Sequence, residues 1–156
     1  MTIRPATADD VPQVLPMVEK ICALHESWDA AKYGFLPDIA SMYRGWLTSR
    51  ANDDRSVFLV AQREDRIVAF LVGTVEREIP IYRLREFGFI HDLWVEPEYR
   101  NEGIARQMTM LAIEQFRAMG VKQIRLDTAA KNDAARGLFG SCGFRISTSE
   151  MLLELV

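Results

Sequence analysis

The stretch that most constrains the fold of this chain couples a strand to a helix through a short turn. Residues 89–95 are mostly apolar and predict a strand that stops at Pro97. A turn with Arg100 and Gly103 follows, and apolar residues then recur at helical spacing up to Phe116. Because the first amides of a helix have no partners within it, and the helix dipole is positive there, this arrangement favours an anion. A glycine allows a phosphate to approach the backbone, and Arg100 adds charge.

The size and charge of the chain limit the kinds of ligand it can take. Its 156 residues predict a single domain over 1–156, and 49% hydrophobic residues suffice for a core. The net charge of −3 argues against nucleic acid, which needs a broad basic face. A small anionic ligand needs only local charge, which Arg100 and Arg106 can supply.

Cysteines and hydropathy indicate the compartment. Cys22 and Cys142 do not make a disulfide framework, and no metal-ligand spacing accompanies them, so we expect no metal. The first residues lack the apolar core of a signal peptide, and no run approaches the length of a membrane span. We therefore expect a reduced, cytoplasmic protein that does not bind membranes.

The turn resembles the pyrophosphate loop of the GNAT N-acetyltransferases. Arg100 is followed by two residues, Gly103, one residue and Ala105, directly after a strand that ends in Val-x-Pro. The dinucleotide fingerprint needs G-x-G-x-x-G instead, and the lysine and Ser/Thr of a P-loop are missing. The resemblance implies acetyl-CoA as co-substrate. Its phosphates would contact the loop residues Arg100, Asn101, Glu102, Gly103, Ile104, Ala105 and Arg106.

A second motif, residues 132–144, resembles the GNAT segment after the fifth strand. An asparagine starts a short helix there, and Gly-Phe enters the next strand. The resemblance implies that Asn132 hydrogen-bonds the pantetheine arm, although a plain helix cap would explain it equally. It also implies that the backbones of Leu93 and Val95 pair with pantetheine as an added strand. A buried central strand without a ligand is the alternative.

The order of predicted elements also matches the GNAT order. It indicates an α+β fold, a central mixed, mostly antiparallel sheet with helices on both sides. The connection at 76–86 is charged and contains Pro80; its residues 79–85 offer a mixed surface for a homodimer. We expect helices near 11–25 and at 39–50, 103–119 and 132–141, a loop at 28–36, and strands at 2–4, 56–62, 66–75, 87–95, 121–128, 144–149 and 151–155.

Acetyl transfer to an amine needs a base, and His91 and Asp92 are the candidates. Some GNAT enzymes have Glu-Asp at this place, with the glutamate as base, and His91 replaces that glutamate. Histidine titrates near pH 6.5 and suits this role, although a structural histidine fits equally. Because side chains alternate along a strand, we expect His91 and Asp92 on opposite faces. Asp92 either attracts a cationic amine or satisfies backbone amides.

Phe139 departs from the family pattern. Many GNAT enzymes have a tyrosine here, whose hydroxyl protonates the leaving sulfur, and phenylalanine has no proton to give. A thiol with a pKa near 8.5 is a fair leaving group, so transfer need not be abolished. Ser141, Cys142 or a water could substitute. A non-catalytic CoA-binding domain is the alternative reading.

The acceptor site is expected between His25 and Trp46. In GNAT folds this helix–loop–helix covers the substrate side, and carboxylates beside aromatic rings suit an ammonium ion. Core packing explains His25 better, and solvated acids or core aromatics are the general alternative. The acidic, aromatic and histidine candidates in this region are His25, Glu26, Trp28, Asp29, Tyr33, Phe35 and Tyr43. Of these, we predict Glu26, Trp28, Asp29 and Tyr33 as the substrate residues. We interpret the chain as an N-acetyltransferase for a primary amine, most simply a small molecule, with a protein N-terminus or lysine as the alternative acceptor.

Overall fold

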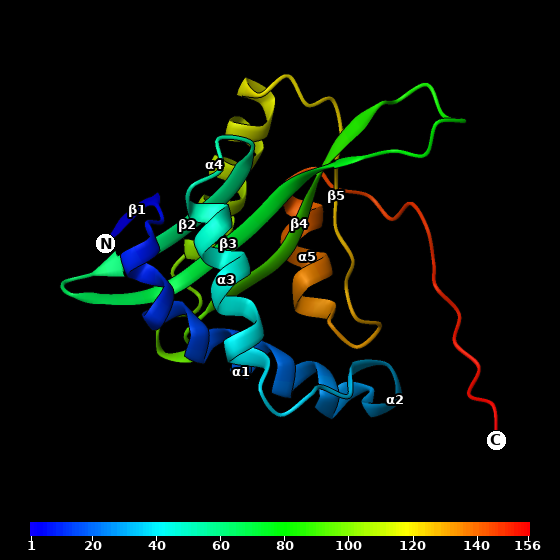
Figure 1. Ribbon diagram of the computed structural model, residues 1–156, viewed down its shortest axis with the longest axis horizontal. Coiled ribbons are helices and arrows are strands. Elements are labelled where there is room, and N and C mark those ends of the chain that lie inside the picture. Colours follow the sequence, from blue (N-terminus) through cyan, green and yellow to red (C-terminus); the bar gives the residue numbers. More distant parts are fainter.

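A five-stranded sheet organises the computed structural model, which describes residues 1–156. The strand order is β1-β2-β3-β4-β5, and Figure 1 shows the sheet with helices on both sides. Neighbouring strands are antiparallel except β4 and β5, which are parallel. The strands are β1 (Thr2–Pro5), β2 (Ser56–Arg63), β3 (Arg66–Arg77), β4 (Glu86–Val95) and β5 (Ile124–Arg125). The predicted α+β fold with a mixed, mostly antiparallel sheet is confirmed.

The helices form two groups around the sheet. On one face lie α1 (Val11–Trp28), α2 (Ala30–Tyr33) and α3 (Ile39–Ala51). On the other lies α4 (Ile104–Ala118), with α5 (Asp133–Ser141) beside it. Short 3-10 turns precede α1 and α4, at Ala8–Asp10 and Pro97–Tyr99. The predicted helices are confirmed, and α2 is an additional turn of helix in the segment predicted as loop.

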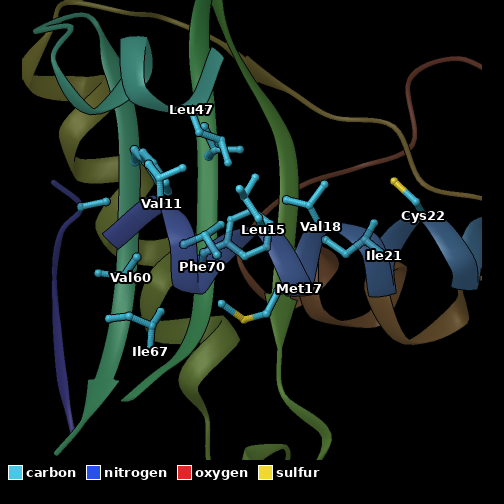
Figure 2. Close-up of a cluster of buried hydrophobic side chains, with 14 residues drawn as sticks. Val11, Leu15, Met17, Val18, Ile21, Cys22, Leu47, Val60, Ile67 and Phe70 are labelled. Atoms are coloured by element: carbon cyan, nitrogen blue, oxygen red, sulfur yellow. The ribbon is translucent and has the colours of Figure 1, made fainter. Parts of the chain in front are cut away.

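Each face of the sheet has its own apolar core. Figure 2 shows the first, in which α1 residues such as Leu15 and Val18 pack with Leu47 of α3 and Phe70 of β3. In the second, Met108, Ala112 and Phe116 of α4 pack on β2, β3 and β4. These two cores hold β3 and β4 at the centre of the molecule, where the candidate site lies.

The close approach of α4 to the sheet depends on two glycines. A Cβ atom on Gly88 would lie 2.9 Å from the Phe116 ring, and one on Gly73 would lie 3.0 Å from it. Both distances are too short for carbon atoms, so only glycine lets this ring pack flat against the strands.

Of the three strands predicted in the second half of the chain, one is shorter than expected and two are absent. The strand expected at 121–128 is regular only at Ile124–Arg125. Residues 144–149 and 151–155, expected as strands, have no regular structure and no strand partner. Because a strand is stabilised by pairing with a neighbour, apolar sequence alone does not make one.

None of the helices is long and apolar enough to cross a membrane.

Candidate active site

The turn before α4 leaves backbone amides free. Asn101 and Gly103 both have positive φ values, 64° and 81°, which turn the chain sharply into the helix. No side chain caps α4, and its first backbone bond runs from the Gln107 amide to the Gly103 carbonyl at 3.0 Å. The amides of residues 104–106 therefore have no partner in the chain. Such amides at the positive end of a helix fit a phosphate group.

The charged residues around this turn favour the binding of an anion. Arg100 donates from Nε to the Val95 carbonyl at 2.9 Å, and its guanidinium lies 4.6 Å from the centre of the Trp94 ring. Arg100 thus fastens the turn to the end of β4. The Glu102 carboxylate accepts from Arg63 at 3.0 Å, so its negative charge is balanced, and Arg106 is exposed on the helix.

One edge of β4 has no strand partner beside this turn. The parallel ladder to β5 ends at the pair Phe89 and Arg125. On the other side, the Glu96 amide donates to the Val68 carbonyl of β3 at 2.9 Å. Since bonding alternates along an antiparallel pair, the backbone groups of Leu93 and Val95 point away from β3, toward the unpaired edge. The Val95 carbonyl is bound by Arg100, which leaves its N–H and both groups of Leu93 available.

Residues 132–144 contain α5 and the residues that flank it on both sides. Asn132 caps the helix, because its Oδ1 accepts from the Ala135 amide at 3.1 Å. Its Nδ2 makes no hydrogen bond within the chain. Phe139 is buried and packs edge-on against Phe144, with ring centres 5.5 Å apart. Ser141, a possible substitute acid, donates its hydroxyl to the Leu138 carbonyl at 2.6 Å.

A β-bulge places His91 and Asp92 on the same face of the sheet. Val72 pairs with Asp92 and Gly73 pairs with Ile90, so His91 is the extra residue in β4. The His91 ring lies 5.2 Å from Trp46, and Asp92 accepts from the Tyr43 hydroxyl at 3.2 Å; both partners belong to α3. The expectation of opposite faces is wrong because the bulge interrupts the alternation. No hydrogen bond joins His91 to Asp92.

His91 belongs to a short chain of hydrogen bonds. The Thr74 hydroxyl donates to Glu76 at 2.7 Å and lies 2.8 Å from His91 Nε2. Because that hydroxyl proton is used on Glu76, Nε2 carries the imidazole proton, and Nδ1 keeps a free lone pair. Burial lowers the pKa of His91, so the ring is neutral at neutral pH. Its side chain is 29% exposed and hence accessible to a small molecule or water.

Asp92 lies in a less polar environment than His91. Burial raises its pKa to about 6, although the hydrogen bond from Tyr43 opposes the rise. The same carboxylate is close enough to raise the pKa of Cys22, for which burial is the larger cause, to about 11. Burial likewise raises the pKa of Tyr43. These three side chains connect β4 with α1 and α3.

A pocket of about 350 Å³ lies between α1 and the segment that leads into α3. Cys22 lines it together with three carboxylates, those of Glu19, Glu26 and Asp38, and no lysine or arginine lines it. Apolar side chains such as Phe35 and Ile39 make up most of the remaining wall. An apolar pocket with several carboxylates and no basic group suits a cation with a hydrocarbon body.

The other predicted acceptor residues lie at the far end of α1. His25 stacks on Tyr33 with ring centres 4.8 Å apart and meets Trp28 edge-on at 5.6 Å. Asp29 caps α2 by accepting from the Lys32 amide at 3.3 Å. Of the four predicted acceptor residues, only Glu26 lines the pocket.

The sequence reasoning missed Thr74 and Glu76 as partners of His91. They are two residues apart in β3, so both face the side of the sheet that carries α3. That spacing was a usable signal, but the register between β3 and β4, with its bulge, was needed to bring them to His91.

A mixed sheet open beside β4, with free helix amides where the opening ends, can hold an extended ligand that carries amides and a phosphate. The model of the acetyltransferase (GNAT) family matches residues 21–144. The chain belongs to the acetyltransferase (GNAT) family.

Individual relatives support the assignment. A mutant of the BH1408 protein from Bacillus halodurans has a crystal structure with a TM-score of 0.87 and 26% identity, and the match covers all of both chains. An uncharacterised N-acetyltransferase of Archaeoglobus fulgidus is 29% identical over 93% of each chain. Human N-acetyltransferase 8 is 29% identical over 69% of this chain, which spans only 45% of the human protein.

Proposed function

We propose that this protein acetylates a primary amine on a small cationic molecule, by direct attack of the amine on acetyl-CoA. The observation that carries the proposal is the unpaired edge of β4, which runs into the free amides of residues 104–106. An extended ligand with amide groups at one end and phosphates at the other matches both features at once.

The residues present fit acetyl-CoA, which supplies the activated acetyl group. The free amides at the start of α4 would hold the pyrophosphate, with Arg100 and Arg106 nearby. Leu93 and the Val95 N–H would pair with the pantetheine amides. Asn132 can cap α5 through Oδ1 and donate from Nδ2 to the pantetheine arm at the same time, so the structural role and the binding role are compatible.

The proposed binding site for the acceptor amine rests on the carboxylates of the pocket and on the neutral imidazole of His91. The pocket lined by Glu19, Glu26 and Asp38 would attract an ammonium ion, and Asp92, charged at neutral pH, adds negative potential behind Cys22. His91 Nδ1 would take the proton that the amine must lose before it attacks. Glu76 and Thr74 are positioning residues, because they hold the other ring nitrogen in its protonated form.

The leaving thiolate has no obvious protein acid. Phe139 has no hydroxyl and Ser141 is bound to a backbone carbonyl, so we propose that a water protonates the sulfur. With a thiol pKa near 8.5, the thiolate also leaves without full protonation.

The test is acetyl transfer from radiolabelled acetyl-CoA to a panel of amines. The panel holds small dications, neutral small amines, and peptides with a free N-terminus or lysine. We expect the small cations to react fastest, and Glu26→Gln to raise their KM more than it lowers kcat. Glu114→Gln, an exposed acid on α4, is the matched control. Turnover of peptides alone would favour a protein acceptor, and no turnover with any amine would contradict the proposal.

A homodimer and a cytoplasmic location belong to the same proposal. The exposed side chains of Ile79, Ile81 and Tyr82 at the β3–β4 hairpin support the dimer. The two free cysteines are compatible with a reducing compartment, which stays a prediction.

A further inference from the structure

Acetylation of a cationic amine releases a proton as well as the acetylated product. An ammonium ion must lose one proton before its nitrogen can attack, and that proton must reach the solvent in every turnover. In the proposed site His91 takes the proton at Nδ1, and a bound acceptor would then occupy the exposed side of the ring. The proton therefore needs a way out of the site that does not pass through the acceptor.

A hydrogen-bonded path leads from the other ring nitrogen to the surface. His91 Nε2 lies 2.8 Å from the Thr74 hydroxyl, which donates to Oε1 of Glu76 at 2.7 Å. Thr74 is 6% exposed and is therefore shielded from water. The Glu76 side chain is 46% exposed, so its carboxylate can exchange protons with the solvent. The path thus has one buried link and one end in water.

The hydroxyl between the two ionisable groups distinguishes this path from a simple anchor. A carboxylate that only orients a histidine binds the ring N–H directly. Glu76 Oε1 lies 3.7 Å from His91 Nε2, which is too far for a hydrogen bond. Because a hydroxyl is both a donor and an acceptor, Thr74 can take a proton from Nε2 and pass its own to Glu76.

Two aromatic rings hold the imidazole in line with this path. Phe89, which pairs with Thr74 across the two strands, lies 4.9 Å from the His91 ring, and Trp46 of α3 lies 5.2 Å from it. Their tilted and perpendicular contacts restrict rotation of the imidazole. Burial and the positive charge of Arg50 lower the pKa of His91, which favours release of the proton from the ring.

We propose that Thr74 and Glu76 form a proton relay, which carries the amine's proton from His91 to the solvent while the acceptor is bound. Nδ1 takes the proton of the ammonium ion, Nε2 passes its own proton to the Thr74 oxygen, and the Thr74 hydroxyl hydrogen moves to Glu76. The amine nitrogen is left with a free electron pair, and His91 is neutral with its proton on Nδ1. Glu76 then releases one proton to water.

The relay returns to its starting state once the product has left. Water then removes the proton from Nδ1, and a proton from the solvent returns through Glu76 and Thr74 to Nε2. Each turnover releases one proton in total, which matches the conversion of an ammonium ion into a neutral amide. The inference rests on the proposed function, in which His91 is the base.

The first test counts the protons that move together, by measuring kcat in mixtures of H₂O and D₂O at pH 8 with a strongly basic amine. A relay moves several protons in one step, so the plot of rate against deuterium fraction should curve for the wild type. Thr74→Ser keeps the hydroxyl and should keep the curve. Thr74→Val has a similar shape without the hydroxyl, so it should lower kcat about 10-fold and give a straight line.

The second test compares a strongly basic with a weakly basic amine at the same pH. Only the first arrives as an ammonium ion and must send a proton to the solvent, because the proton that a neutral amine loses during attack can pass to the thiolate. Glu76→Gln cannot take up a proton, so it should lower kcat about 10-fold for the strongly basic amine and much less for the weakly basic one. Glu86→Gln, an acid of β4 that pairs with Arg55, is the matched control and should affect neither.

The outcomes separate the relay from the function on which it rests. A straight plot for the wild type, or equal losses for the two amines in Glu76→Gln, would overturn the relay and leave Thr74 and Glu76 as positioning residues. The assignment of His91 as base would still stand if His91→Ala loses activity with both amines. Full turnover by His91→Ala would overturn the base and the relay together.

Discussion

The two faces of the sheet build their parts of the site in different ways. On the α4 face, the groups that we propose bind acetyl-CoA are backbone amides and one strand edge, at Leu93, Val95 and residues 104–106. On the α1–α3 face, the groups that we propose form the acceptor site are side chains from four elements, such as Glu26, Tyr43, Thr74 and His91.

The difference explains why the two halves tolerate change differently. A backbone site survives most substitutions as long as the turn keeps its conformation, and Gly103 with φ 81° is the position on which that turn depends. A side-chain site loses its chemistry when one residue changes. Acceptor specificity can therefore vary while the acetyl-CoA half stays the same.

The largest effect is expected at Gly103. Gly103→Glu puts a carboxylate beside the free amides of α4, and like charges at an interface cost several kcal/mol, so affinity for CoA should fall at least about 100-fold. Calorimetry with CoA measures the change. Gly103→Ala introduces the same backbone strain at this positive φ but no charge, so its affinity for CoA should fall much less. Unchanged affinity in a folded Gly103→Glu protein would remove the turn from the site.

The next effect concerns His91 on the acceptor face. His91→Ala should lower kcat roughly 100-fold, at the low end for a general base, with CoA affinity nearly unchanged. Because burial holds the pKa of His91 below its usual 6.5, the wild-type rate should rise with pH below neutrality and then level off. The acceptor in this measurement should be a weakly basic amine, because its own ionisation then lies below the pH range over which the rate is measured.

Glu76→Gln provides the control for this assignment. The Glu76 charge raises the pKa of His91, so its removal should shift the rising limb of the pH profile to lower pH. A purely structural role for Glu76 would leave the midpoint unmoved. If His91→Ala keeps full turnover on its best amine, the histidine is structural.

Asp92 should affect stability by a smaller amount. The rise of its pKa from 3.8 to about 6 means that the folded state keeps a proton that the unfolded state loses between these values. Stability therefore falls as pH rises through this window and stays lower above it. Asp92→Asn should raise the free energy of unfolding by about 2 kcal/mol at pH 8 and by far less near pH 4. Urea titrations at both pH values measure this, and an equal effect at both would exclude a buried charge as the cause.

The smallest effect is expected at Phe139. If the site lacks a protein acid, Phe139→Tyr should place a phenol near the sulfur and raise turnover by up to roughly 10-fold, below the full range for general acids. Acetyl-CoA consumption over the amine panel compares the two proteins. Equal, substantial rates would show that a water already suffices.

Much of the fold followed from local patterns. The apolar run before Pro97, the glycine turn and the helical spacing up to Phe116 lie next to one another in sequence, so the strand, turn and α4 could be predicted together. The residues that we propose hold acetyl-CoA come from the same stretch. Their local conformation could be predicted because a strand, a turn and a helix start need no distant partner.

The remaining features depend on distant contacts. The bulge at His91 arises from the register between β3 and β4, which alternation along one strand cannot reveal. The pocket needs α1 and the start of α3 packed together, so only Glu26 of the predicted acceptor residues reached it. Residues 144–155 have a strand-like sequence, but no strand of the sheet pairs with them.

Hydrogen exchange of single backbone amides, with and without acetyl-CoA, tests the central claim most directly. The amides of Leu93, Val95 and residues 104–106 have no partner in the chain and should exchange rapidly, then slow strongly when acetyl-CoA binds. The amide of Ala61, inside the ladder between β2 and β3, is the control and should change little. Saturating acetyl-CoA that leaves Leu93 and Val95 as rapid as before would contradict the claim that the open edge of β4 holds the co-substrate.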